Sequence, residues 1–284
     1  MDDGNSQHRS QDADHDGVGP GFHPGIAGRA RPMGELADVV RRLIGLVVTN
    51  TAPPEVLDEI VDRLGSAADV LSAHVPSDPV PRFVEPPEGG PGELDSASMD
   101  GAMPYDPVVG RYNPIALPVE ISFEPPLAVG TACFTTPYEG GPGWVHGAAL
   151  AAAFDIVLTA ANHLAGSAGP TVWLTVRFRR PTLVGVDARF EAEVVANDGR
   201  RVRSQGRLIQ DGLVCVEAEG EFAVLDPGRI RTVAERSRRR GPKSQGRGGA
   251  ATATMGATSV VPASEPSKGA SPKAKIPPSD ATNQ

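Results

Sequence analysis

Cysteine and long uncharged apolar runs are scarce in this sequence of 284 residues. Its two cysteines, Cys133 and Cys215, each lie in a strand-like run, so we expect reduced, buried thiols and no disulfide framework. No apolar run reaches about 18 residues without a charge, and the N-terminus lacks the apolar core of a signal peptide. The sequence therefore predicts a cytoplasmic protein without a membrane span.

Metal-ligand and phosphate-loop patterns are missing as well. The six histidines are scattered, the cysteines form no paired-ligand motif, and the glycine-rich segments 89–92 and 140–143 lack the lysine of a phosphate loop. We therefore expect no metal and no cofactor. The basic run 236–240 suits an acidic partner, but no aromatic residues are interleaved with it, and we expect no nucleic-acid partner.

Composition divides the chain into five segments. Residues 1–34 lack apolar periodicity and are expected to be disordered, whereas apolar residues at helical spacing predict a helical hairpin over 35–75. Dense proline and glycine over 76–113 indicate a linker or an extended arm. A compact domain follows over 114–227, and 228–284 form a basic tail that we expect to be disordered.

The compact domain shows the pattern of an antiparallel sheet and one long helix. Two strands around residues 119–123 and 129–135 precede a glycine loop, a helix from Gly147 to about Leu164, and three long strands. The strands alternate apolar and polar residues, so one face of the sheet is solvated. The alanine-rich helix is the only long apolar element nearby, and we expect it to cover the other face.

The charges on the solvated face indicate the register of the last three strands. Three-residue loops at the turn signals near Gly199 and Gly212 would align Glu193 with Arg203 and Arg203 with Glu219. A two-residue loop would instead pair a polar face with an apolar one, so we predict three-residue loops at both turns.

Asp155 is the only formally charged residue between Glu139 and Arg177. An ionised carboxylate inside so apolar a helix costs several kcal/mol unless it is compensated, which indicates a chemical role. The alternative is a structural role, in which Asp155 caps a loop or pairs with an arginine of the sheet.

The spacing of several residues around Asp155 resembles that of the hotdog-fold acyl-CoA thioesterases. His146-Gly147 is followed by Asp155 nine residues later and by Thr171, with Pro181 ten residues further on. The segment 140–143 is similar to the glycine-rich loop of the subgroup that includes animal thioesterase superfamily members and bacterial phenylacetate-pathway thioesterases. The resemblance covers about residues 114–227 and implies an α+β hotdog fold, a curved antiparallel sheet wrapped around a central helix.

The resemblance also implies roles for four residues in acyl-CoA hydrolysis. Gly147 would donate its N–H to the thioester carbonyl, and His146 would bond that carbonyl or shape the loop. Asp155 would act as general base or as nucleophile, and Thr171 would orient the water or the carboxylate. Nine residues of helix rise about 13.5 Å, so His146 and Asp155 of one chain cannot meet at one group. The family pattern therefore implies composite sites in a homodimer or a dimer of dimers.

Four further residues are candidate substrate contacts. Trp144 and Phe154 would flank the acyl tunnel, although both are also ordinary core residues. Arg179 and Arg180 would meet the phosphates of coenzyme A, or are solvated charges at a strand end. Two other functions remain open: a hotdog module that binds acyl-CoA without hydrolysis, and a hotdog hydroxyacyl dehydratase.

Overall fold

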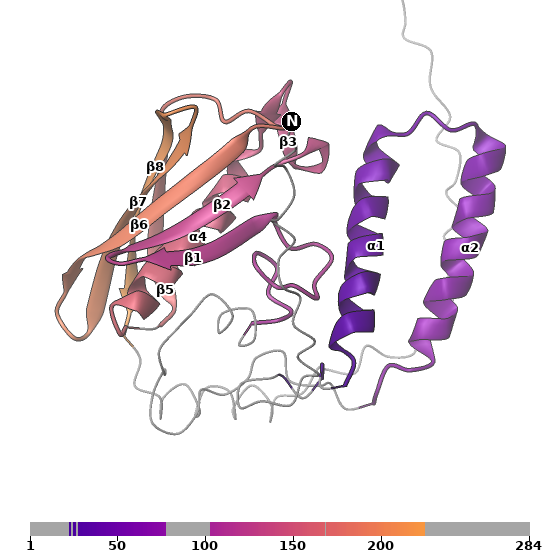
Figure 1. Cartoon of the computed structure of the whole chain (residues 1–284), viewed down its shortest axis with the longest axis horizontal. Helices are drawn as coiled ribbons and strands as arrows, with labels where there is room; N and C mark the ends of the chain where they lie inside the picture. The colour runs from indigo at the N-terminus through magenta and orange to yellow at the C-terminus, as the bar shows by residue number, and fades with distance from the viewer. Residues whose placement is uncertain (1–22, 24, 27, 78–102, 168, 225–284) are drawn as a thin grey trace, which may run out of the picture. The chain divides into compact units, whose positions relative to one another are not determined.

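The computed structural model describes residues 23, 25–26, 28–77, 103–167 and 169–224 (Figure 1). The segments predicted to be disordered, 1–34 and 228–284, lie mostly or wholly outside the described residues, as does 78–102 of the predicted linker. The helices are α1 (Ala30–Thr49), α2 (Pro54–Ser72) and α4 (Gly147–Leu164), with a 3-10 turn η1 (Thr136–Tyr138). The strands are β1 (Val119–Glu124), β2 (Leu127–Cys133), β3 (Glu139–Gly141), β4 (Trp144–Val145), β5 (Thr171–Phe178), β6 (Asp187–Asn197), β7 (Arg201–Gln210) and β8 (Leu213–Ala223).

Six strands form one antiparallel sheet in the order β1-β2-β6-β7-β8-β5. The sheet curves around α4, which packs mainly on β2, β6 and β7 (Figure 1). This is the hotdog fold, so the predicted fold class is confirmed. The central helix also has the predicted bounds.

Small residues allow α4 to lie close to the sheet. A Cβ on Gly130 of β2 would lie 3.0 Å from Cγ2 of Val157, and one on Gly206 of β7 would lie 3.4 Å from Cδ2 of Leu158. Phe154 of α4 packs edge-on against Phe190 of β6, with ring centroids 5.1 Å apart. By length and composition α4 could cross a membrane, yet half of it is buried, which is the environment of a core helix.

The core extends beyond the predicted start of the compact domain. Val109 and Ala116 are buried, and Val109 belongs to the same apolar cluster as α4. Arg41 of α1 donates hydrogen bonds to the carbonyl oxygens of residues 110, 111 and 113, and Arg111 forms a two-pronged ion pair with Asp38. The segment 103–117 therefore packs on the domain and anchors α1.

The β7–β8 turn corrects the predicted loop length. Asp211 and Gly212 form a two-residue turn, and both have positive φ, 50° and 74°. A bulge between β7 and β8 leaves Cys215 without a partner on β7, so that Arg207 lies opposite Glu217 and not opposite Val216. The prediction of a three-residue loop was wrong because a bulge restores the polar register that a two-residue turn alone would break.

The β6–β7 connection, residues 198–200, has the predicted length but a different register. Val195 bulges out of the pairing, and Glu193 faces Gln205 instead of Arg203. The row of charges on the outer face is therefore Glu191, Arg207 and Glu217. Of the two cysteines, Cys215 is buried as expected, whereas Cys133 is exposed, contrary to expectation.

Glu191 is the centre of an ion-pair network on the outer face of the sheet. Its carboxylate accepts hydrogen bonds from Arg189 at 2.9 Å and from Arg207 at 2.8 Å, and its side chain is only 14% exposed. The hydrogen bond from Arg189 is the main cause that lowers the pKa of Glu191 below its ordinary value of 4.5. A carboxyl whose pKa is lowered by folding stabilises the fold when ionised, and this contribution is lost as pH falls through the folded-state pKa.

We therefore predict that Glu191→Gln lowers the free energy of unfolding by about 1 kcal/mol at pH 7. The difference from wild type should shrink as pH falls below 4.5, because the wild-type carboxyl then becomes protonated too. Urea denaturation of wild type and variant at pH 7 and at lower pH measures the difference in the free energy of unfolding at each pH. Glu193→Gln is the matched control, since Glu193 accepts only a neutral hydrogen bond from Gln205. An equal loss at both pH values would contradict the prediction.

Candidate active site

A short glycine-rich ribbon positions the start of α4. The predicted glycine loop forms the antiparallel pair β3–β4, which turns at Gly143, where φ is 77°. The backbone N–H of His146 donates to the carbonyl of Tyr138 at 2.8 Å, and that of Val145 donates to the carbonyl of Thr182 at 2.8 Å. A Cβ on Gly140 would lie 2.8 Å from Cα of His146, so only glycine allows this close approach. The ribbon therefore fixes where the helix begins.

His146 is the N-cap of α4. Its Nδ1 accepts a hydrogen bond from the backbone N–H of Ala148 at 3.0 Å, so its neutral ring carries the proton on Nε2. The side chain is exposed. The structure thus assigns His146 a loop-shaping contact and leaves Nε2–H able to donate outward.

Gly147 places its backbone at the positive end of the helix dipole. The first N–H groups of a helix have no intrahelical acceptor, and no hydrogen bond from the N–H of Gly147 is formed within the described part of the chain. A Cβ at this position would lie 3.1 Å from Cζ of Phe178, so the aromatic ring of β5 covers the helix start. An anionic or polarised oxygen would be stabilised at this N–H.

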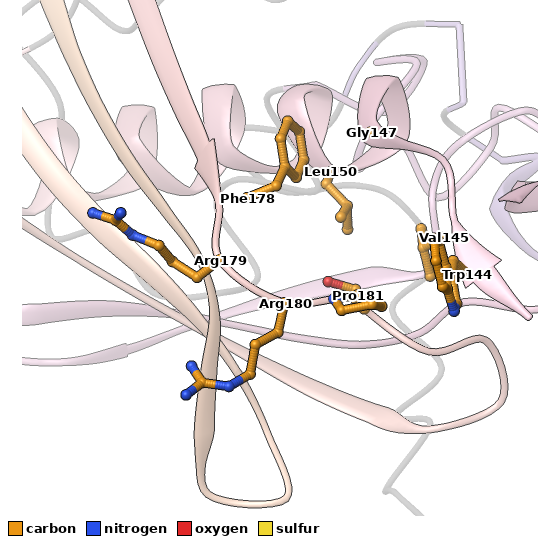
Figure 2. A pocket seen from close by; sticks show the side chains of 9 residues that line it. Trp144, Val145, Gly147, Leu150, Phe178, Arg179, Arg180 and Pro181 are labelled. Atoms are coloured by element: carbon orange, nitrogen blue, oxygen red, sulfur yellow. The ribbon is translucent and has the colours of Figure 1, made fainter. Parts of the chain in front are cut away.

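A hollow of about 430 Å³ opens beside this helix start (Figure 2). Phe178 and Leu150 lie near Gly147, with Trp144 and Val145 on the other side of the hollow (Figure 2). The remaining lining residues are Arg179, Arg180, Pro181 and Thr182. The hollow therefore has apolar walls, and Arg179 and Arg180 line it with their guanidinium groups extending away from the apolar side chains (Figure 2).

The bulge at Cys215 positions both cations. The carbonyl oxygen of Cys215 accepts hydrogen bonds from the backbone N–H groups of Arg179 at 2.8 Å and Arg180 at 3.0 Å. The Arg179 guanidinium pairs with Glu217 at 2.7 Å, so much of its charge is neutralised. The Arg180 guanidinium donates to the carbonyl of Val214 at 2.9 Å and forms no ion pair with any residue in the described ranges. Arg180 is therefore the freer of the two cations.

Asp155 and Thr171 form a second polar pair. The Thr171 hydroxyl donates to Oδ1 of Asp155 at 2.6 Å, joining the middle of α4 to the start of β5. Asp155 is half-buried and Thr171 is exposed. The hydroxyl fixes the orientation of the carboxylate and leaves Oδ2 available to a proton donor.

The structure brings the predicted site residues together as two separate groups. Trp144, Gly147, Arg179 and Arg180 line the hollow, and His146 adjoins it as the helix cap. Asp155 and Thr171 form the other group, about 13.5 Å along α4 from His146. One chain therefore holds these two groups of residues apart.

One predicted substrate contact lies elsewhere, and three lining residues were not predicted. Phe154 is fully buried in the core and does not line the hollow. Leu150, Phe178 and Thr182 do line it. The strand alternation placed Phe178 on the inner face, where its ring reaches the start of α4, but on this edge strand the side chain remains 56% exposed. Within the described ranges, no cluster of His, Cys, Asp or Glu could hold a metal ion.

Comparison with known proteins points to one family. The family model described as thioesterase superfamily matches residues 142–216. A thioesterase superfamily protein of known structure is 31% identical, with a TM-score of 0.57, and the match covers 67% of this chain and 94% of that protein. Zebrafish thioesterase superfamily member 2 is 16% identical, with coverage of 47% and 100% and a TM-score of 0.41. The PaaI protein from the E. coli phenylacetic acid degradation operon is 20% identical, with coverage of 39% and 81% and a TM-score of 0.37. No match was found among the curated proteins.

The ribbon predicts different effects for its first two glycines. Gly140→Ala should lower the Tm by roughly 4–8 °C, because the new methyl group would overlap the backbone of His146. Gly141→Ala is the matched control and should shift the Tm by less than about 2 °C, since its Cβ would meet only Trp144, at an ordinary 3.5 Å. Thermal unfolding followed by circular dichroism measures both. Equal shifts would contradict the close approach at Gly140.

Proposed function

Since this chain belongs to the thioesterase superfamily, we propose that it hydrolyses acyl-CoA thioesters to a carboxylic acid and coenzyme A. The observation that carries this proposal is the Thr171–Asp155 hydrogen bond. It holds an oriented carboxylate on an otherwise uncharged helix, as required of a base or nucleophile. A module that only binds acyl-CoA has no need of such a group.

The start of α4 would stabilise the charge that develops during hydrolysis. As water or a carboxylate attacks the thioester carbon, the carbonyl oxygen becomes negative. The N–H of Gly147 and the helix dipole would stabilise that oxygen. Nε2–H of His146 is a second donor, because Nδ1 is occupied by the cap hydrogen bond.

Asp155 would promote attack on the thioester carbonyl carbon by one of two routes. As general base it takes a proton from water, the hydroxide adds to the carbonyl carbon, and the C–S bond breaks to release the thiolate of coenzyme A. As nucleophile it forms a mixed anhydride with loss of the same thiolate, and water then cleaves the anhydride. Thr171 holds the carboxylate in both routes. No separate cofactor takes part in either.

A second chain would complete the site. β5 is an edge strand of the sheet, and its residues Val172 and Phe178 are 47% and 56% exposed. The outward face of α4 carries Ala148, which is exposed, and Ala152 and Asp155, which are half-buried. Pairing of two β5 edges would set two α4 helices side by side, so that the helix start of one faces Asp155 of the other. We therefore propose a homodimer with two composite sites.

The hollow suits the acyl group and the adjoining end of coenzyme A. Trp144, Leu150 and Phe178 offer apolar contact to the acyl chain. Arg180, which has no carboxylate partner within the described ranges, would pair with a phosphate of coenzyme A, with Arg179 beside it. As acyl-CoA esters are soluble intracellular metabolites, we also propose that the protein acts in the cytoplasm.

Asp155→Asn should reduce hydrolysis by about a hundredfold or more while the protein remains folded. Release of free thiol from short, aromatic, medium and long acyl-CoA esters measures the rate and ranks the substrates. Thr171→Val should reduce the rate by about tenfold, because the carboxylate loses its orienting hydroxyl. Thr175→Val is its matched control on the same strand and should leave the rate of hydrolysis nearly unchanged.

Three outcomes would contradict the proposal. Normal turnover by Asp155→Asn would remove Asp155 from the chemistry. No thiol release by wild type, with acyl-CoA bound, would favour the non-catalytic binding module. Hydration of an enoyl-CoA by wild type in place of thioester cleavage would favour the dehydratase.

His146→Asn separates the capping role of His146 from a role in catalysis. Asparagine is a good N-cap, so its side-chain oxygen should still accept from Ala148 and the Tm should change little. If Nε2–H stabilises the carbonyl oxygen, kcat should fall by roughly tenfold to a hundredfold with the fold intact. An unchanged kcat would show that His146 only shapes the loop.

A further inference from the structure

The hairpin of α1 and α2 exposes apolar surface that its own described chain does not cover. α2 buries none of its residues, and α1 buries only Gly34 and Ala37. Large aliphatic side chains at helical spacing form two aliphatic stripes, which are Leu36, Val39, Leu46 and Val47 on α1 and Leu57, Ile60, Val61, Leu64 and Leu71 on α2. Stripes of this period normally face a core, so a covering partner is expected.

The area of the stripes is that of a protein interface. The nine residues are 39% to 66% exposed and present on the order of 700 Å² to solvent. The largest apolar patch on a typical monomer is roughly 300–600 Å². In a standard protein–protein interface each partner buries about 800 Å². The hairpin thus carries about one side of such an interface.

A short, ordered connection joins the two helices. Asn50 caps the end of α1, donating to the carbonyls of Leu46 and Val47 at 3.0 Å and accepting from the N–H of Ala52 at 3.1 Å. Pro53 then leads directly into α2. Such short connections join antiparallel neighbours in helix bundles, yet α1 and α2 do not pack closely against each other within the single chain. We propose that a second copy of this chain covers the stripes, so that two hairpins form a four-helix bundle.

The charges of the hairpin favour a second copy over a membrane. α2 carries five acidic residues and one basic residue, whereas α1 carries three basic and two acidic residues. Helices that lie on anionic lipid are typically rich in Lys and Arg, and the acidic α2 would be repelled. In a two-fold bundle, α1 of one copy can lie beside α2 of the other, which places opposite net charges together.

The basic tail of the same chain is another candidate for covering α2. Residues 228–284 contain eleven Lys and Arg and three Asp and Glu, so they would be attracted to α2. Their aliphatic residues are few and scattered, however, with only Ile230 and Val233 at helical spacing near the basic run. A second hairpin offers a full set of matching aliphatic side chains, and the tail does not.

Hydrogen–deuterium exchange of the full-length wild-type chain tests the proposal without any substitution. α1 and α2 should become protected as protein concentration rises through the dissociation constant of the bundle, because their exposure depends on a second molecule. Protection that is independent of concentration, or that disappears when 228–284 are removed, would show that the chain covers its own stripes. Absence of protection at every concentration, or protection only with anionic phosphatidylserine vesicles, would also overturn the proposal.

A matched pair of variants then locates the interface. Leu64→Glu places a charge in the stripe of α2. It should raise the dissociation constant of the bundle of two hairpins at least tenfold, as measured by analytical ultracentrifugation. Ser66→Glu adds the same charge on the opposite face of α2 and should leave it unchanged. Because no residue of α2 is buried by the described part of the chain, both variants should keep the helical content of wild type. Equal dissociation constants for the two variants would overturn the proposal, whatever the rate of thioester hydrolysis.

Discussion

The close packing of α4 against the sheet is the constraint on which the rest of the structure depends. An apolar helix can lie close to a curved sheet where the facing strand residues are small, and Gly130 and Gly206 leave room for Val157 and Leu158. The helix is then held at a fixed height and direction. Its start therefore meets the glycine ribbon, and its middle brings Asp155 within 2.6 Å of Thr171. The positions of both groups of candidate site residues follow from this one packing arrangement.

The same packing leaves part of the sheet uncovered. A single helix covers β2, β6 and β7, but the end of the sheet at β5 extends beyond it. The exposed side chains of Val172 and Phe178 lie there, next to the polar groups proposed for catalysis. The exposed apolar side chains and the polar groups of the proposed catalytic site thus lie at the same edge of the sheet. A dimer at this edge would resolve both, which is a physical reason for a composite site in a fold with one central helix.

The elements of the domain could be predicted from the sequence, but the details of pairing could not. Glycines before Gly147 and apolar periodicity gave the bounds of α4, and alternation gave the long strands. The bulges at Val195 and Cys215 leave no mark in that alternation, because a bulged residue looks like any other strand residue. The Cys215 bulge matters most, since its carbonyl positions Arg179 and Arg180. Phe178 was missed for a similar reason, because its exposure depends on which strands the helix covers.

The exposure of the hairpin could not be predicted from the sequence for a different reason. Amphipathic periodicity shows that a helix has an apolar face, but it does not show which surface that face meets. In α1 the side that packs on the domain and the side that carries Leu36 and Val39 adjoin each other, so one helix is both anchored and exposed. Arg41 and Asp38 fix the anchored side through the loop around Arg111. The apolar surface left over is thus held in place by polar contacts, as an interface requires.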